Sequence, residues 1–199
     1  MAFLLFVCAI TLFSQTNRYE IKSGIVEYDV IAVSNIQNLT TEGTSVLLFK
    51  DFGKLELIDE RLVHKLNGLE DEEERNITKI SKNKILTVDF NDEVIYSQDL
   101  DVDDDLANIK NKDTFTQMGA KFLGNETILG YKCDVWELGE YKTWVYNGVV
   151  LKQISRSSSA EQMQIAKNAN FNIDIKDSKF KLPNFPVKNI DVIISEGED

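Results

Sequence analysis

The sequence predicts a mainly β protein of the α+β class, built around an antiparallel sheet, and two observations carry this prediction. From Arg18 onward, most of the chain consists of short stretches rich in Val, Ile, Leu, Phe and Tyr, separated by Gly, Asn, Asp and Ser. The separators are too short to hold the crossover helix that parallel strands require, which favours antiparallel neighbours joined by tight turns. The balance of 43% hydrophobic and 28% charged residues is that of a globular chain able to bury its own core.

The N-terminus predicts export. Residues 2–13 form an uncharged apolar run, too short to span a bilayer as a helix and about as long as the apolar part of a secretory signal. We predict a signal peptide over residues 1–16 and a single domain over residues 17–199, with no stable membrane insertion after the leader is removed. Bulky residues precede Cys8, so a lipid anchor there is not expected. Without Cys8, Cys133 has no intramolecular disulfide partner, and an exported protein of this size without disulfides fits the bacterial periplasm.

Alternation and turn residues divide the chain into strands. Residues 24–33 alternate between two partly apolar faces. Residues 43–52 follow, and Phe52-Gly53-Lys54 turns the chain back into residues 55–59. Further short strands are expected at residues 76–81, 84–90, 93–97, 122–124, 127–129 and 189–194.

Three stretches are less clear in their structure. The acidic run at residues 69–75 is expected to be a solvated loop or the edge of a strand. Residues 161–171 fit a helix or a strand, and periodicity alone does not separate the two. Residues 174–182 suggest a short helical turn, which Pro183 and Pro186 would end.

One longer helix is predicted, beginning near Asp103. The carboxylates before it suit the unsatisfied amides and the positive end of a helix. The alternate carboxylates of residues 99–103 would also suit calcium ligands, but Asp104 replaces the turn glycine and Lys110 replaces the closing glutamate of such a loop. We therefore expect no metal site.

Residues 130–153 are the most distinctive part of the sequence. They predict three short strands separated by two glycine turns, and they contain both tryptophans of the chain. Asn147-Gly148 is typical of a type I′ hairpin turn, which requires a positive φ at both central residues. Trp136, Trp144 and Tyr146 lie on these strands, where they either pack in the core or line a site for an apolar ligand.

Nothing in the sequence indicates catalysis or a cofactor. His64 is the only histidine, so a histidine-rich metal site is excluded, and a hydrolase would have to be built on that residue. No phosphate-binding glycine loop or nucleophile elbow is present. The formal net charge of −11 has the wrong sign for a nucleic-acid partner. We expect no catalytic residues, no metal and no cofactor.

Two groups of residues resemble a known family. Residues 124–136 (GNETILGYKCDVW) and 142–152 (KTWVYNGVVLK) resemble the G-x-E-x-I-x-G-Y-x-C-x-x-W and W-V-x-x-G-x-x-L-K patterns of LolA-like periplasmic proteins, the outer-membrane lipoprotein carrier superfamily. Farther on, Phe171-Asn172-Ile173-Asp174 and Phe180-Lys181-Leu182-Pro183 are similar to the closing segment of that group.

The resemblance implies a strongly curved antiparallel sheet, a half-open barrel, with a few helices over its concave side and an apolar cavity between them. It also implies a periplasmic protein that binds a lipid or the acyl chain of an acylated protein non-covalently and has no enzymatic activity. Two other hypotheses remain open: a structural or protein-interaction module of the cell envelope whose core is filled by its own side chains, and, more weakly, a hydrolase.

Overall fold

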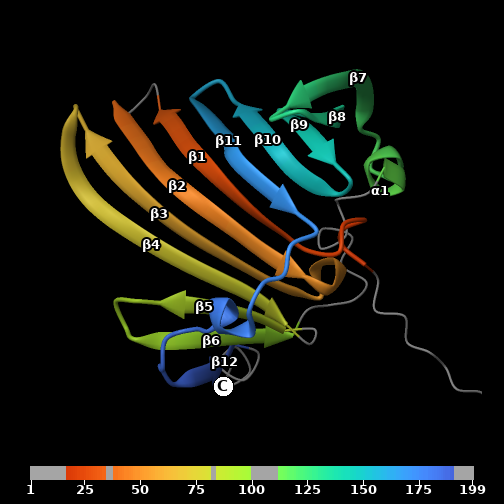
Figure 1. Cartoon of the computed structure of the whole chain (residues 1–199). Helices are drawn as coiled ribbons and strands as arrows, with labels where there is room; N and C mark the ends of the chain where they lie inside the picture. The colour runs from red at the N-terminus through yellow and green to blue at the C-terminus, as the bar shows by residue number, and fades with distance from the viewer. Residues whose placement is uncertain (1–16, 35–37, 82–83, 100–111, 191–199) are drawn as a thin grey trace, which may run out of the picture.

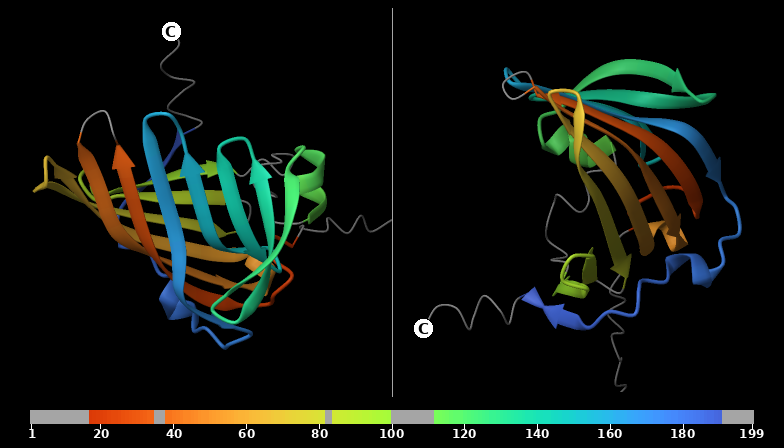
Figure 2. Two further views of the ribbon diagram at one scale, coloured as in Figure 1. Left: turned by 90° about the horizontal axis from the view of Figure 1, so that it is seen from above. Right: turned by 90° about the vertical axis from the view of Figure 1, so that its left-hand side faces the viewer.

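The computed structural model describes residues 17–34, 38–81, 84–99 and 112–190 of the chain. One twelve-stranded sheet dominates this part of the chain and curves into an open half-barrel (Figures 1 and 2). The strands are β1 (Gly24–Ser34), β2 (Leu39–Lys50), β3 (Leu55–Leu66), β4 (Leu69–Ser81), β5 (Lys84–Asp89), β6 (Val94–Asp99), β7 (Lys121–Ile128), β8 (Tyr131–Leu138), β9 (Tyr141–Tyr146), β10 (Val149–Arg156), β11 (Ala160–Phe171) and β12 (Val187–Asn189). The helical elements are η1 (Asp51–Gly53), α1 (Lys112–Gln117) and η3 (Asp177–Phe180).

The sheet consists of two antiparallel meanders joined at its centre. Its strand order is β12-β6-β5-β4-β3-β2-β1-β11-β10-β9-β8-β7. Strand β1 joins the halves because it pairs with β2 on one side and with β11 on the other. All neighbours are antiparallel except β12 and β6, which run parallel. The predicted fold class, a mainly β, strongly curved antiparallel sheet, is confirmed.

Tight turns set the register of the meanders. Asn147 and Gly148 have φ of 47° and 84°, as a type I′ turn requires, and Tyr146 pairs directly with Val149. The prediction for this hairpin is confirmed. A second Asn-Gly turn, Asn67-Gly68, joins β3 to β4 in the same way, with φ of 53° and 80°.

The structure decides the stretches that the pattern left open. The acidic run at residues 69–75 belongs to β4, and β5 pairs only with residues 77–81, so the acidic half of β4 is an exposed strand edge. Carboxylates on such an edge disfavour pairing with other chains. Residues 161–171 form β11 as a strand, because they fill the position beside β1. The predicted helical turn is the 3₁₀ turn η3.

Three predictions fall partly outside the described residues. The start of the helix near Asp103 lies outside them, and α1 is a helix of six residues at 112–117. The candidate calcium ligands after Asp99 also lie outside. Asp99 itself ends β6 and forms an ion pair with Lys84 at 2.5 Å. The last strand is predicted at residues 189–194, of which 191–194 lie outside the described residues, and β12 spans Val187–Asn189.

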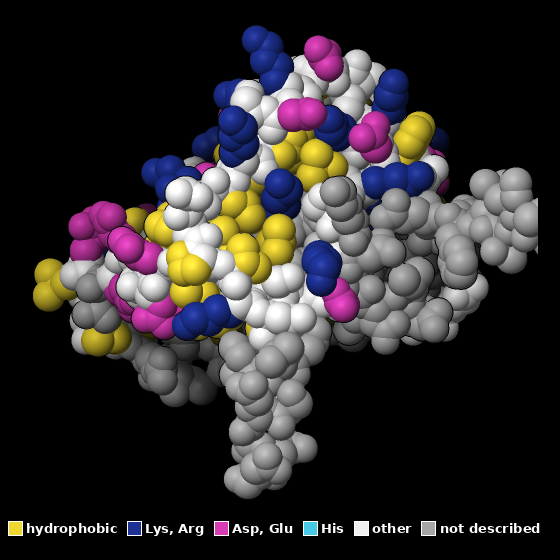
Figure 3. Space-filling view, turned by 90° about the horizontal axis from the view of Figure 1, so that it is seen from below, with side chains coloured by type: hydrophobic (Ala, Val, Ile, Leu, Met, Phe, Trp, Pro, Cys, Tyr) yellow, Lys and Arg dark blue, Asp and Glu magenta, His cyan; other side chains and the backbone are white. Residues whose placement is uncertain are grey.

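The two faces of the sheet are covered differently. The segment after β11, with η3, packs on the convex face, and α1 lies on the concave side (Figure 2). On the convex face Ile175 and Phe180 join Leu57 and Ile77 in one buried cluster. From below, hydrophobic side chains gather in the middle of the visible face, and Lys, Arg, Asp and Glu side chains surround them and are scattered among them (Figure 3). The side chains of the concave face are therefore the ones that the C-terminal segment leaves uncovered.

Gly43 allows a close approach of β2 and β3. A Cβ added at this position would lie 2.1 Å from the carbonyl oxygen of Arg61 on the paired strand. We predict that Gly43→Ala lowers the free energy of unfolding by about 2 kcal/mol, because the backbone of β3 would have to move. Chemical denaturation measures this loss. Thr44→Ala, at the exposed neighbouring position, is the control and should cost well under about 1 kcal/mol; equal losses in the two variants would contradict the explanation.

Candidate functional site

The candidate site is built on the concave face by the alternation of side chains along five adjacent strands. Directly paired residues point to the same side of a sheet. Tyr28 pairs with Ser45, and Leu47 pairs with Ile58. Their neighbour Leu57 points the other way, into the cluster under the C-terminal segment. The first four residues therefore share the concave face.

A pocket of about 240 Å³ opens on this face. Its apolar wall consists of Leu47, Ile58 and Val150, and hydroxyl, amide and carboxyl groups complete it. The full lining is Tyr19, Tyr28, Ser45, Leu47, Glu56, Ile58, Val150, Gln153 and Gln164. This combination of an apolar wall with a few polar groups is typical of a small-molecule site, and the volume lies just below the usual range of about 300–1,000 Å³.

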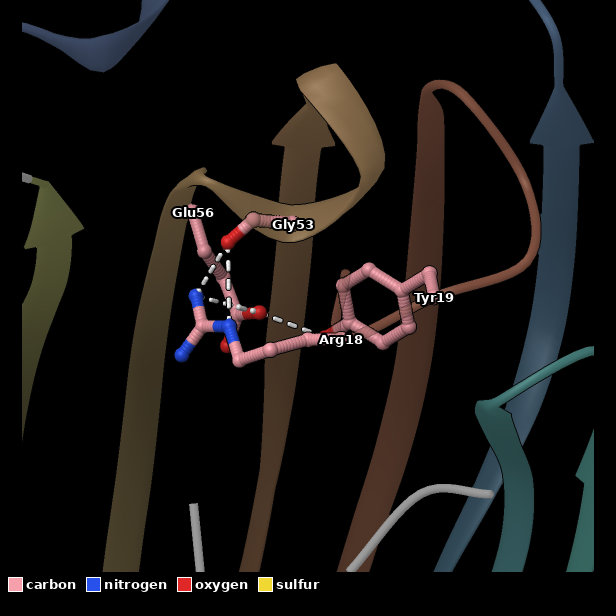
Figure 4. A network of polar contacts seen from close by, with 4 residues as sticks. All are labelled: Arg18, Tyr19, Gly53 and Glu56. Atoms are coloured by element: carbon pink, nitrogen blue, oxygen red, sulfur yellow. Dashed lines mark hydrogen bonds and ion pairs between the residues drawn. The ribbon is translucent and has the colours of Figure 1, made fainter. Parts of the chain in front are cut away.

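A buried ion pair holds the N-terminal segment against this pocket (Figure 4). The Arg18 guanidinium lies 3.2 Å from a carboxylate oxygen of Glu56, and their side chains are only 8% and 3% exposed. The same guanidinium donates two hydrogen bonds to the carbonyl oxygen of Gly53, at 3.0 and 2.5 Å. Tyr19 donates its hydroxyl to Glu56 at 2.5 Å. The charge of Glu56 is thus stabilised by a cation and a hydroxyl donor, as a buried carboxylate requires.

The two tyrosines of the pocket remain protonated. Burial and the nearby Glu56 carboxylate raise the pKa of Tyr19 well above its ordinary value. The same two causes raise the pKa of Tyr28, whose hydroxyl donates to the backbone oxygen of Val150 at 2.8 Å. Both hydroxyls therefore act as neutral hydrogen-bonding groups, and neither is a candidate nucleophile or base at physiological pH.

The structure separates the two tryptophans predicted as ligand contacts. Trp136 pairs with Thr143 while Trp144 pairs with Val135, so the indoles lie on opposite faces of the β8–β9 hairpin. Trp136 stacks on Phe115 of α1, with ring centroids 5.4 Å apart. Trp144 lies in the largest core cluster, and the half-buried Tyr146 packs against that cluster. The fold therefore brings Trp144 and Tyr146 together in one cluster, whereas Trp136 lies apart from both.

The tryptophans are also deeply buried. Trp136 is 4% exposed and Trp144 is 3% exposed. The Trp144 indole donates to Glu126 at 2.7 Å, and the ammonium groups of Lys142 and Lys152 lie 4.6 and 4.5 Å from its ring centre. A ligand would have to displace side chains to reach either indole. Their role as ligand contacts stays a prediction.

His64 takes part in a polar row across β2, β3 and β4. Its Nδ1 lies 2.9 Å from the Thr41 hydroxyl, and its Nε2 lies 3.0 Å from a carboxylate oxygen of Glu74. This order of hydroxyl, imidazole and carboxylate resembles a hydrolase triad. Thr41, however, lies in the middle of the sheet, paired with Ala32 and His64, so its backbone amide belongs to the strand ladder and offers no oxyanion hole.

Cys133 shows no sign of reactivity. It is fully buried in the core cluster, and burial raises the pKa of its thiol to about 11. Such a thiol is neutral at physiological pH and is a poor nucleophile.

A larger pocket, of about 550 Å³, lies between the N-terminal segment and the segment after β11. Its lining is mostly polar and of mixed charge, and Lys50 and Asp177 form an ion pair within it. We favour the smaller concave pocket as the binding site, because it has an apolar wall.

The centre of the site is not among the residues predicted from the sequence. Glu56 stands between Leu55 and Leu57 in the first four residues of β3, which are otherwise apolar, and a carboxylate at such a position signals either an exposed face or a buried partner. The partner, Arg18, is far away in the sequence, and only the fold brings it to Glu56.

Comparisons with known proteins support the fold. No protein-family model and no curated protein matches the chain. An uncharacterised conserved protein from Thermus thermophilus matches over 86% of this chain and 94% of its own, with a TM-score of 0.54 and 9% identity. A putative outer membrane lipoprotein-sorting protein domain from Vibrio parahaemolyticus is also similar (TM-score 0.36, 8% identity, 84% and 93% covered). So is LprF from Mycobacterium bovis (TM-score 0.34, 10% identity, 80% and 90% covered). At 9% identity the likeness to the Thermus thermophilus protein concerns the fold and not the function.

None of the helices in the described part of the chain is long and apolar enough to cross a bilayer.

Removing the cation of the buried pair tests its contribution. We predict that Arg18→Met lowers the free energy of unfolding by about 3 kcal/mol, because the Glu56 carboxylate loses the charge that offsets its desolvation. The double variant Arg18→Met, Glu56→Gln should recover most of this loss, since the amide can still accept from Tyr19. Equilibrium denaturation of both variants measures the effect. A double variant no more stable than the single one would show that the loss has another cause.

Glu60 pairs with Ser45 beside the pocket, and burial, together with the Glu74 carboxylate, raises its pKa. A raised carboxyl pKa means that the folded state favours the protonated form, so ionisation destabilises the fold as the pH rises through this pKa. We predict that Glu60→Gln raises the melting temperature at neutral pH and not at about pH 3, below the ordinary carboxyl pKa. Glu73→Gln, exposed on the opposite face, is the control for net charge. An increase in the melting temperature that is equally large at the acidic pH would refute the raised pKa of Glu60 as its cause.

Proposed function

We propose that the protein is an exported, periplasmic and non-enzymatic binding protein that holds an apolar ligand, a lipid or the acyl chain of an acylated protein, in its concave pocket. The observation that carries the proposal is the pocket itself, with its wall of Leu47, Ile58 and Val150. Strand pairing places it on the concave face, opposite the convex face on which the C-terminal segment packs. The predicted signal peptide over residues 1–16 supports export.

The shape and chemistry of the pocket support non-covalent binding. Its volume of about 240 Å³ suits one unbranched chain and is small for a bulky ring system. Chain and pocket would associate through removal of apolar surface from water, at about 25 cal/mol per Å². The hydroxyl of Tyr28 and the amides of Gln153 and Gln164 would orient a polar end.

The aromatic residues of the β8–β9 hairpin have a proposed part in this function. Tyr146 is half-buried at the margin of the core cluster, and Trp144 lies in the same cluster. Trp136 faces α1 on the opposite side of the hairpin. None of the three lines the concave pocket, so we propose that they contact the ligand through a rearrangement of the hairpin when the ligand enters, with Trp136 reached beside α1. Ligand-dependent quenching of tryptophan fluorescence would report such contacts.

One observation favours the rival interpretation, an envelope module with a self-filled core. Both tryptophans are buried like the other core residues, and the described residues contain no buried side-chain polar atom without a hydrogen-bond partner. A protein that binds only other proteins would need no open pocket. The two functions therefore differ in whether the concave pocket takes up a lipid.

Ligand uptake tests the proposal directly. We predict that the protein purified from its native host carries lipid detectable by mass spectrometry, and that the delipidated protein binds a fluorescent fatty-acid derivative. Gln164→Trp should fill the pocket and lower the affinity at least about tenfold, by steric exclusion. Asn168→Trp, exposed on the opposite face of β11, is the matched control and should bind normally.

A protein that is empty from its host and takes up no probe would overturn the proposal and favour the self-filled module. Circular dichroism of both tryptophan variants verifies that they fold, so a loss of binding in Gln164→Trp alone is assigned to the pocket.

A further inference from the structure

The central strands separate their charges between the two faces. Apart from Tyr28, the described ionisable side chains of β1–β4 on the same face as the pocket are four carboxylates and one histidine. By strand pairing they are Glu56, Glu60, His64, Glu72 and Glu74. The lysines and arginines of these strands lie on the convex face. There Arg75 forms an ion pair with Asp59, and Lys65 forms one with Glu42. Lys50 points to the same side, toward Asp177 of the C-terminal segment.

The positive groups near the pocket are already engaged. The Arg18 guanidinium is bound to Glu56 and to the carbonyl of Gly53. The His64 ring lies between Thr41 and Glu74. An incoming anion would have to break one of these contacts to find a positive partner. The concave face therefore offers an anion few partners other than neutral hydrogen-bond donors.

Glu60 is the carboxylate best placed to act on a ligand. It lies on the pocket's face of β3, two residues from Ile58, and pairs with Ser45, which lines the pocket. Among the described residues no ion pair forms at Glu60. Burial is the larger cause of the raised pKa of Glu60, and the nearby Glu74 carboxylate, which adds a negative potential at this position, is the second. A cation placed here would relieve the repulsion between the two carboxylates.

We infer that the concave pocket prefers amphiphiles with a cationic head group over those with an anionic one. This inference rests on the proposed binding function and names the ligand class of the same site. The apolar tail lies against Leu47, Ile58 and Val150, and the head group lies beside Glu60. An ammonium group there replaces part of its lost hydration by the carboxylate, whereas a carboxylate or sulfate group meets a like charge.

Probes with one tail and different heads test the inference. The delipidated protein is titrated with dodecyltrimethylammonium, dodecyl maltoside and dodecanoate, each below its micelle concentration, by isothermal calorimetry at low salt. We expect the ammonium probe to bind about tenfold more tightly than dodecanoate, with the maltoside between them. Added salt should shrink the difference, because the interaction is between partly exposed charges.

A variant assigns the selectivity to one residue. Glu60→Gln should reduce the ratio of the affinity for dodecyltrimethylammonium to the affinity for dodecanoate about fivefold, as expected for the loss of one charge at a half-buried position. Glu73→Gln removes the same charge from the exposed opposite face and should leave the ratio unchanged. Melting curves of both variants establish that they fold.

The outcomes separate this inference from the function on which it rests. Binding of all three probes with equal affinity, or tightest binding of dodecanoate, would leave lipid binding in place and overturn the selectivity. An unchanged ratio in Glu60→Gln would overturn the role of that carboxylate. Binding of none of the probes, together with no uptake of the fluorescent fatty-acid derivative, would overturn the proposed function and the selectivity with it.

Discussion

The two-residue period of the strands is the constraint on which the rest of this structure depends. Once β1 is placed between β2 and β11, each side chain belongs to one face, and a shift of one residue would move every side chain to the other. The same rule puts Leu57 under the C-terminal segment and its neighbours Glu56 and Ile58 in the concave pocket. Core, pocket and charge distribution are thus consequences of one register.

The contact between the N-terminal segment and the sheet includes a buried charge. Glu56 lies in a strand whose neighbouring residues are apolar, and in isolation its burial would be strongly unfavourable. The Arg18 guanidinium and the Tyr19 hydroxyl offset that cost, and both come from the segment just before β1. The pair therefore ties residues that are distant in sequence into one end of the half-barrel. Its geometry positions the polar part of the pocket lining.

The β8–β9 hairpin, which carries both tryptophans, shows what the local sequence pattern can and cannot decide. Alternation along β8 and β9 placed Trp136 and Trp144 on strands, and the Asn147-Gly148 turn set the register of β9 and β10, as expected. The assignment of both tryptophans to one site did not follow from this pattern. Strand pairing puts them on opposite faces, where one meets Phe115 of α1 and the other meets the core.

The amino-acid sequence by itself determined the mainly β, antiparallel character of the fold, because alternation and turn chemistry act over a few neighbouring residues. It also indicated the hairpins and the short turn at η3 for the same reason. Only the tertiary structure decided that residues 161–171 are a strand, that the acidic run is the edge of β4, and that Arg18 meets Glu56. These features depend on partners many residues away, and burial of a charge or the choice between helix and strand is settled by that partner, not by the local pattern.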